Sequence, residues 1–65
     1  MKSEICTLLK RESREMSTRE IAAELDEFNL AIGISCGSLE REGKLTARRI
    51  YDEFGNVEEI YWKAN

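Results

Sequence analysis

Apolar residues recur at intervals of three and four positions in the first part of the chain. Ile5, Leu8 and Leu9 follow this spacing, and most positions around them are charged. Such a pattern places one apolar stripe along an α-helix. We therefore expect an amphipathic helix over residues 3–14, with the hydroxyl of Ser3 capping its first turn.

A second helix is predicted immediately afterwards. Ser17 and Glu20 have the spacing of a capping box, in which each side chain bonds the backbone N–H of the other residue. Ile21, Ala22 and Leu25 then form the apolar face of a short helix that ends near residue 26.

A third helix is predicted over residues 30–42. Asn29 is the expected N-cap, since its side chain accepts hydrogen bonds from the first turn. Gly43 is expected to end this helix in the left-handed conformation that glycine adopts readily. The stripe that we expect to face the core consists of Ile32, Cys36 and Leu39.

The period changes after residue 43 to that of a β-hairpin. Residues 44–51 and 57–63 are predicted as strands, and residues 52–56 form the turn between them. The segment around Met16 is expected to add a small third strand, and Trp62 is expected to point into the core. The predicted cross-strand ion pairs join Arg48 and Arg49 to Glu58 and Glu59.

Three helices followed by a hairpin is the element order of a winged helix-turn-helix. The sequence therefore predicts an α+β fold with three helices, a C-terminal β-hairpin wing and a small three-stranded sheet, as one domain over residues 1–65. In this fold the third helix fits the major groove of DNA, and the wing reaches a flanking groove or a phosphate.

Composition narrows the classes of function. The 65 residues include 13 acidic and 10 basic side chains, which give a net charge of −3, and there is no His. A negative net charge argues against strong non-specific binding to nucleic acid. Because no nucleophile–base pair, metal-ligand cluster or phosphate-binding Gly loop is present in the sequence, we expect neither an enzyme nor a cofactor or metal site.

The two cysteines and the apolar segments indicate a compartment. Cys6 and Cys36 are expected to be free thiols that pack as small apolar residues. The apolar stretches are too short to span a bilayer, and residues 1–10 lack the pattern of a signal peptide. We therefore expect a cytoplasmic protein without a membrane partner, either monomeric or weakly homodimeric.

Four groups of residues, spread over almost the whole chain, follow the pattern of one family. They are Met1-Lys2-Ser3-Glu4-Ile5, then Glu20-Ile21-Ala22 with Leu25, then Leu39-Glu40 with Gly43, and finally Tyr61-Trp62. In these positions the chain resembles the winged-helix fimbrial phase-variation regulators of the FaeA and PapI type. The resemblance implies a small transcriptional regulator that works with the global regulator Lrp and responds to the methylation state of DNA.

The third helix departs from that family. Residues 30–40 carry no basic side chain, whereas the fimbrial regulators place Arg and aromatic residues there. Gly33 and Gly37 stand instead on the face expected to be exposed, at a cost of roughly 1 kcal/mol each relative to Ala. Three interpretations remain open: close packing inside the protein, sequence drift without a structural role, or close approach of another helix or of the DNA backbone. Ile34 between them favours a protein partner.

Two functions are consistent with these observations. The first is a winged-helix transcriptional regulator that binds double-stranded DNA weakly or together with a larger DNA-binding regulator. The second is a protein–protein interaction module that uses the uncharged face of the third helix. For isolated charges, pairing with nearby glutamates on a solvated face is the alternative to contact with phosphate. The candidate DNA-contacting residues are Ser17, Thr18, Arg19, Asn29, Ala31, Ile34, Gly37, Ser38, Arg41, Lys44, Arg48 and Arg49.

Overall fold

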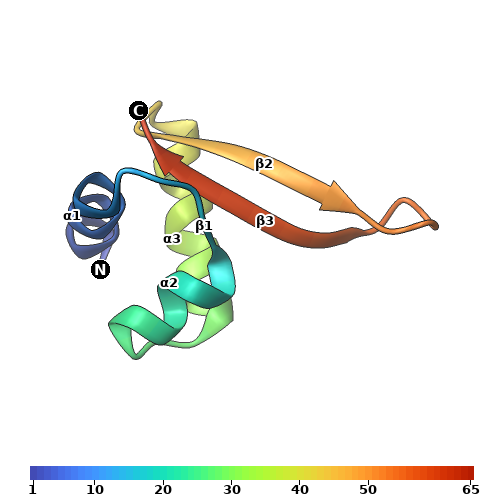
Figure 1. The fold of residues 1–65 in the computed structure, drawn as a ribbon, viewed down its shortest axis with the longest axis horizontal. Helices are drawn as coiled ribbons and strands as arrows, with labels where there is room; N and C mark the ends of the chain where they lie inside the picture. The colour runs from blue at the N-terminus through green and yellow to red at the C-terminus, as the bar shows by residue number, and fades with distance from the viewer.

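The computed structural model describes residues 1–65 and contains three helices and three strands (Figure 1). In chain order the elements are α1 (Lys2–Glu12), β1 (Met16–Ser17), α2 (Thr18–Leu25), α3 (Asn29–Arg41), β2 (Leu45–Tyr51) and β3 (Val57–Ala64). The strands form one antiparallel sheet in the order β1-β3-β2. This arrangement confirms the predicted α+β winged helix-turn-helix.

Helix α1 is shorter at its end than the pattern predicted. It stops at Glu12 because Ser13 adopts a left-handed conformation (φ 54°), and the Ser13 N–H bonds the carbonyl of Leu9 at 3.0 Å. The predicted cap at Ser3 is wrong. The helix starts at Lys2, with Met1 as its N-cap, so Ser3 lies inside the first turn.

The capping box of α2 is confirmed. The hydroxyl of Ser17 accepts the N–H of Glu20 at 3.1 Å, and the Glu20 carboxylate accepts the N–H of Ser17 at 2.9 Å. The predicted N-cap of α3 is wrong, since Asn29 is the first helical residue. Phe28 is the N-cap there, with an extended backbone and no hydrogen bond from its side chain.

The end of α3 follows the prediction at Gly43. This glycine has φ 79°, and its N–H bonds the carbonyl of Glu40 at 3.0 Å. The N–H of Lys44 bonds the carbonyl of Leu39 at 2.9 Å. These two bonds make a Schellman motif, which turns the chain from α3 into the hairpin.

The sheet joins the hairpin to the segment before α2. Met16 pairs with Trp62, so the predicted third strand is confirmed. The predicted ion pairs across the hairpin are wrong, because Arg48 faces Tyr61 and Arg49 faces Ile60. A bulge between Ile50 and Tyr51 shifts the register by one residue and accounts for part of the difference, since without it Arg49 would face Glu59 but Arg48 would face Ile60.

The core lies between the three helices and the end of the sheet that lies against them. Trp62 is the largest fully buried side chain, and its indole N–H donates to the hydroxyl of Thr18 at 2.8 Å. The predicted core stripe of α3 is confirmed, as its three residues are at most 1 % exposed. The core consists of Ile5, Leu8, Leu9, Met16, Ile21, Ala22, Ile32, Cys36, Leu39, Leu45 and Trp62.

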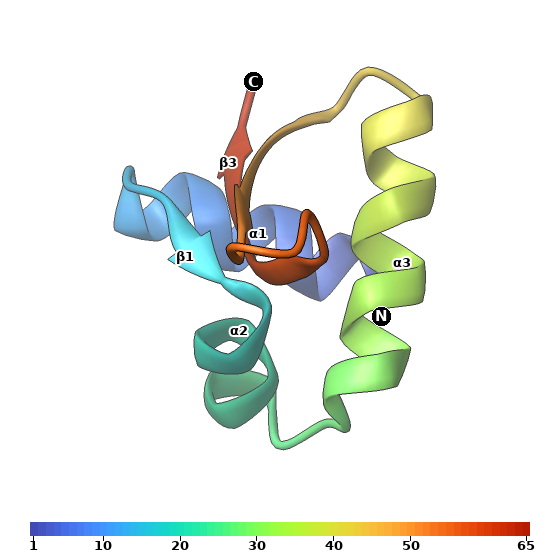
Figure 2. The same cartoon turned by 90° about the vertical axis from the view of Figure 1, so that its right-hand side faces the viewer.

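The elements leave two parts of the molecule projecting. The hairpin of β2 and β3 extends beyond the helices (Figure 1), and α3 runs along one edge with no element on its outer side (Figure 2). None of the three helices combines the length and the apolar content needed to cross a bilayer.

Candidate nucleic-acid interface

The turn between α2 and α3 is tight, as a helix-turn-helix requires. Asp26 adopts a left-handed conformation (φ 55°), and the N–H of Glu27 bonds the carbonyl of Ala22 at 2.9 Å. Three residues therefore suffice to reverse the direction of the chain. The turn holds α3 against α2 and leaves its outer side free (Figure 2).

Four residues define the exposed stripe of α3: Leu30, Ile34, Gly37 and Arg41. Their spacing of four, three and four positions places them on one line along the helix, opposite the buried stripe. Leu30 is 76 % exposed and Ile34 is 64 % exposed. Most of the stripe is therefore apolar, and it ends in one positively charged side chain, Arg41.

The glycines of α3 are not required by internal packing. A Cβ atom added to Gly33 would meet nothing within 4 Å, and one added to Gly37 would meet only the guanidinium of Arg41, at 3.7 Å. Of the three interpretations that the sequence left open, internal packing is therefore wrong. The space above Gly33 is open to an external partner, and above Gly37 only the flexible side chain of Arg41 would have to move.

Two of the candidate cations are free of partners inside the chain. Arg19, at the start of α2, and Arg41, at the end of α3, are both exposed and form no ion pair. Both belong to the helix-turn-helix, where contacts with phosphate fix the position of a protein on DNA. Their charges are available to an anionic ligand.

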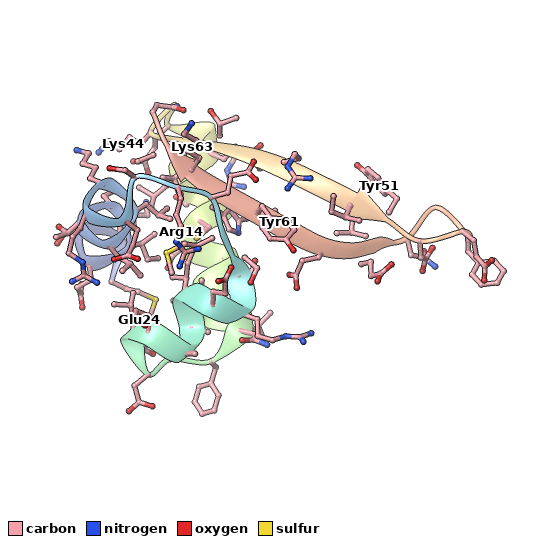
Figure 3. The ribbon with its side chains drawn as sticks, viewed as in Figure 1. Arg14, Glu24, Lys44, Tyr51, Tyr61 and Lys63 are labelled. Atoms are coloured by element: carbon pink, nitrogen blue, oxygen red, sulfur yellow. The ribbon has the colours of Figure 1, made fainter.

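The first arginine of the wing is tied to the segment before β1. The Arg48 Nε and Nη2 atoms donate to the Glu15 carboxylate at 3.0 and 2.9 Å, and the guanidinium lies 4.8 Å from the centre of the Tyr61 ring. Figure 3 places Tyr61 on the hairpin near the body of the molecule. The hydrogen bond from Arg48 lowers the pKa of Glu15. A bidentate pair of this kind holds the cation in place.

The second arginine of the wing is tied to α3. Arg49 donates to both carboxylate oxygens of Glu40, at 2.8 and 3.1 Å, and this contact lowers the pKa of Glu40. Lys44 lies 3.6 Å from the carboxylate of Glu42, which Lys2 also contacts at 2.6 Å. The three candidate cations beyond the end of α3, Lys44, Arg48 and Arg49, thus have acidic neighbours.

The hydroxyl groups of the candidate set serve the fold. Ser17 is buried in its capping box, and Thr18 holds the indole of Trp62. The hydroxyl of Ser38 lies 3.3 Å from the carboxylate of Glu42. We therefore leave these three residues out of the contact surface. Of the remaining candidates, Asn29 is exposed at the start of α3 and Ala31 is half-buried beside the stripe.

The tip of the wing is acidic and carries an exposed aromatic ring. The Asp52 carboxylate accepts the N–H groups of Phe54 and Asn56, each at 2.9 Å, and Gly55 adopts φ 82°. The Phe54 side chain is 81 % exposed. Figure 3 shows Tyr51 near this far end and Lys44 and Lys63 at the opposite end of the hairpin. The acidic residues at or near the tip are Asp52, Glu53, Glu58 and Glu59.

These charges divide the surface. Phosphate is repelled by the tip of the wing and by Asp26 and Glu27 before α3, and it is attracted by Arg19 and Arg41. The sequence did not indicate Glu15 and Glu40 as the partners of the wing arginines. They come from a connecting segment and from α3, and no local pattern relates them to β2.

Cys36 is a core residue. Its side chain is fully buried, and burial raises the pKa of its thiol to about 12. Cys6 is half-buried and packs against the same core, and both thiols are free. At neutral pH the Cys36 thiol is therefore protonated and acts as an apolar group.

Comparison with known proteins found no match among protein-family models, curated proteins or solved structures.

Proposed function

We propose that the chain is a small winged-helix transcriptional regulator that binds double-stranded DNA through α3. Its own affinity is low, and it reaches an effective affinity beside a larger DNA-binding regulator. The observation that carries the proposal is the exposed stripe of α3, in which only the flexible Arg41 side chain lies near Gly37 and Arg41 itself is a cation without an ion pair. The resemblance to the fimbrial regulators names Lrp as the first partner to test.

The size of α3 suits this role. Its 13 residues extend for about 20 Å, which is enough to cross the major groove of B-DNA. Gly33 and Gly37 allow the helix backbone to approach the groove more closely than larger side chains would. Leu30 and Ile34 offer apolar contacts, such as those that read the methyl group of thymine.

Low intrinsic affinity follows from the charges. The chain has a net charge of −3, and Arg48, Arg49 and Lys44 already have acidic neighbours. Only Arg19 and Arg41 are free in the helix-turn-helix. Since each neutralised phosphate contributes roughly −0.9 to the slope of log affinity against log salt, we expect a slope of about −2.

The test is fluorescence anisotropy with a labelled duplex from upstream of the protein's own gene, measured over a series of salt concentrations. Arg41→Glu is expected to reduce affinity by about tenfold and to make the slope shallower by about one. Lys10→Glu is the matched control, because it makes the same change of charge at an exposed, unpaired cation of α1. Equal losses in the two variants would contradict a site on α3.

The same titration is repeated with Lrp present. If no complex forms at the lowest salt concentration, with or without Lrp, the proposed regulator is refuted. Complexes that form only with Lrp support assisted binding. Complexes that form with the protein alone, with a slope much steeper than −2, contradict the low intrinsic affinity.

One observation favours a second candidate function, a protein-interaction module. Phe28, the N-cap of α3, is 83 % exposed, and with Leu30 and Ile34 it makes three large exposed apolar side chains within the N-terminal half of the helix. Such clusters mark protein interfaces. Ile34→Glu discriminates the two functions. If the chain binds DNA through α3, the substitution weakens binding to the duplex. If the chain is only an interaction module, neither the wild type nor the variant binds the duplex.

A further inference from the structure

We infer that the exposed stripe of α3 also pairs with the same stripe of a second copy of this chain, in antiparallel orientation. The stripe consists of Leu30, Ile34, Gly37 and Arg41, as defined above. It is self-complementary in shape and in charge when one copy is turned by 180° about an axis perpendicular to α3. This inference concerns the free protein and does not depend on the proposed binding of DNA.

The complementarity in shape comes from the order of large and small residues. The axis passes midway between Ile34 and Gly37, so the Ile34 side chain of each copy lies over Gly37 of the other. That position is open: a Cβ on Gly37 would meet only the Arg41 guanidinium, 3.7 Å away. A large side chain set into a gap above a glycine is the knob-into-hole packing of paired helices.

The complementarity in charge comes from the two ends of α3. Asp26 and Glu27 precede the helix, and Arg41 closes the stripe. None of these three charges is paired within the chain. In the antiparallel pair the acidic end of one helix lies beside the basic end of the other, at both ends of the interface. A parallel pair would place like charges together, which is unfavourable.

A second copy explains two features that the fold leaves unexplained. Leu30 is 76 % exposed although it lies on the longest helix, and the antiparallel pair covers it with the aliphatic stem of Arg41 from the other copy. The two glycines cost helix stability, and the only side chain of the chain near either of them is the guanidinium of Arg41, above Gly37. Both features follow when another helix packs closely on this face.

The pair is weak because the contact is narrow. Two stripes on helices of 13 residues bury less surface than a standard stable interface. We therefore expect a dissociation constant on the order of 100 µM, in the range of transient complexes. Because the dimer covers the face that we propose for DNA, dimerisation and binding of DNA would exclude each other.

The experiment is sedimentation equilibrium of the intact chain, from micromolar to millimolar concentration, without DNA. The wild type is expected to shift from monomer to dimer. Gly37→Leu and Arg41→Glu are each expected to weaken dimerisation by about tenfold, and the matched control Lys10→Glu by less than twofold. Circular dichroism checks that each variant is folded, which we expect because the stripe lies opposite the core.

The decisive variant is the double reversal Glu27→Lys with Arg41→Glu. In the antiparallel dimer it exchanges the signs of residues 27 and 41 at both ends, although Asp26 keeps its charge, and it is expected to restore affinity to within about threefold of the wild type. A wild type that stays monomeric at millimolar concentration overturns the inference, as does a dimer that Arg41→Glu does not weaken. Dimerisation without binding of DNA would refute only the proposed function, and binding of DNA by a strict monomer would refute only this pairing.

Discussion

Replacing Gly33 by Ala is expected to stabilise the protein, although the glycine lies on the surface that we assign to function. A Cβ there meets nothing within 4 Å, so no packing is lost. Alanine has a higher helix propensity than glycine by about 0.8–1.0 kcal/mol in a helix interior. For a domain of this size, a gain of about 1 kcal/mol raises the melting temperature by roughly 4–8 °C.

The matched control is the same substitution at Gly43, where the structure gives the opposite sign. Gly43 has φ 79°, a conformation that costs a residue with a Cβ about 1–2 kcal/mol. Thermal and urea unfolding of both variants, followed by circular dichroism at micromolar concentration, measures the two effects. If Gly33→Ala destabilises the fold, or if both variants change alike, the glycine has an internal role and the reasoning about α3 fails.

Three further predictions concern contacts that hold the helices and the wing in place. Thr18→Val leaves the indole N–H of Trp62 buried without its acceptor, and urea unfolding is expected to show a loss of about 1–3 kcal/mol. Ser17→Ala removes the cap of α2, and the same assay is expected to show a loss of about 0.5–2 kcal/mol. Arg48→Gln is expected to raise the pKa of Glu15 towards its ordinary value of 4.5, as an NMR titration of the carboxyl would show, and an unchanged titration would contradict the ion pair.

That ion pair also fixes the direction of a pH effect. The pKa of Glu15 is lowered in the folded protein, so its contribution to stability is present above pH 4.5 and is lost as the pH falls through the lowered value. Glu40, whose pKa Arg49 lowers, behaves in the same way. As the pH is lowered through this range, the urea concentration at the unfolding midpoint of the wild type is expected to decrease. The midpoint of Arg48→Gln is expected to decrease less.

Local patterns were sufficient to predict most of the elements. The apolar spacing predicted three helices, the Ser17–Glu20 spacing predicted the capping box, and Gly43 predicted the end of α3. Each of these signals depends on residues within one turn or one strand. The N-cap was predicted one position too late: the helix begins after the extended backbone of Phe28, which forms no side-chain hydrogen bond, and Asn29 is already its first residue.

The charges of the candidate site could not be predicted in the same way. The bulge next to Tyr51 moves Arg49 one position along β3, away from Glu59, whereas Arg48 would face no glutamate with or without the bulge. Their actual partners, Glu15 and Glu40, are brought near by the packing of whole elements. Whether a cation is free or paired therefore depended on tertiary structure, and this decides how strongly the surface attracts phosphate.

The central claim is that DNA contacts the outer face of α3. The most direct test is to follow the backbone amide signals of the ¹⁵N-labelled protein by NMR as the upstream duplex is added, with Lrp present if the protein alone does not bind. The account predicts that the largest shifts lie along α3, at Ile34, Gly37 and Arg41, with a smaller change at Arg19. Shifts confined to the wing around Arg48 and Phe54, or none at α3 at saturation, would contradict it.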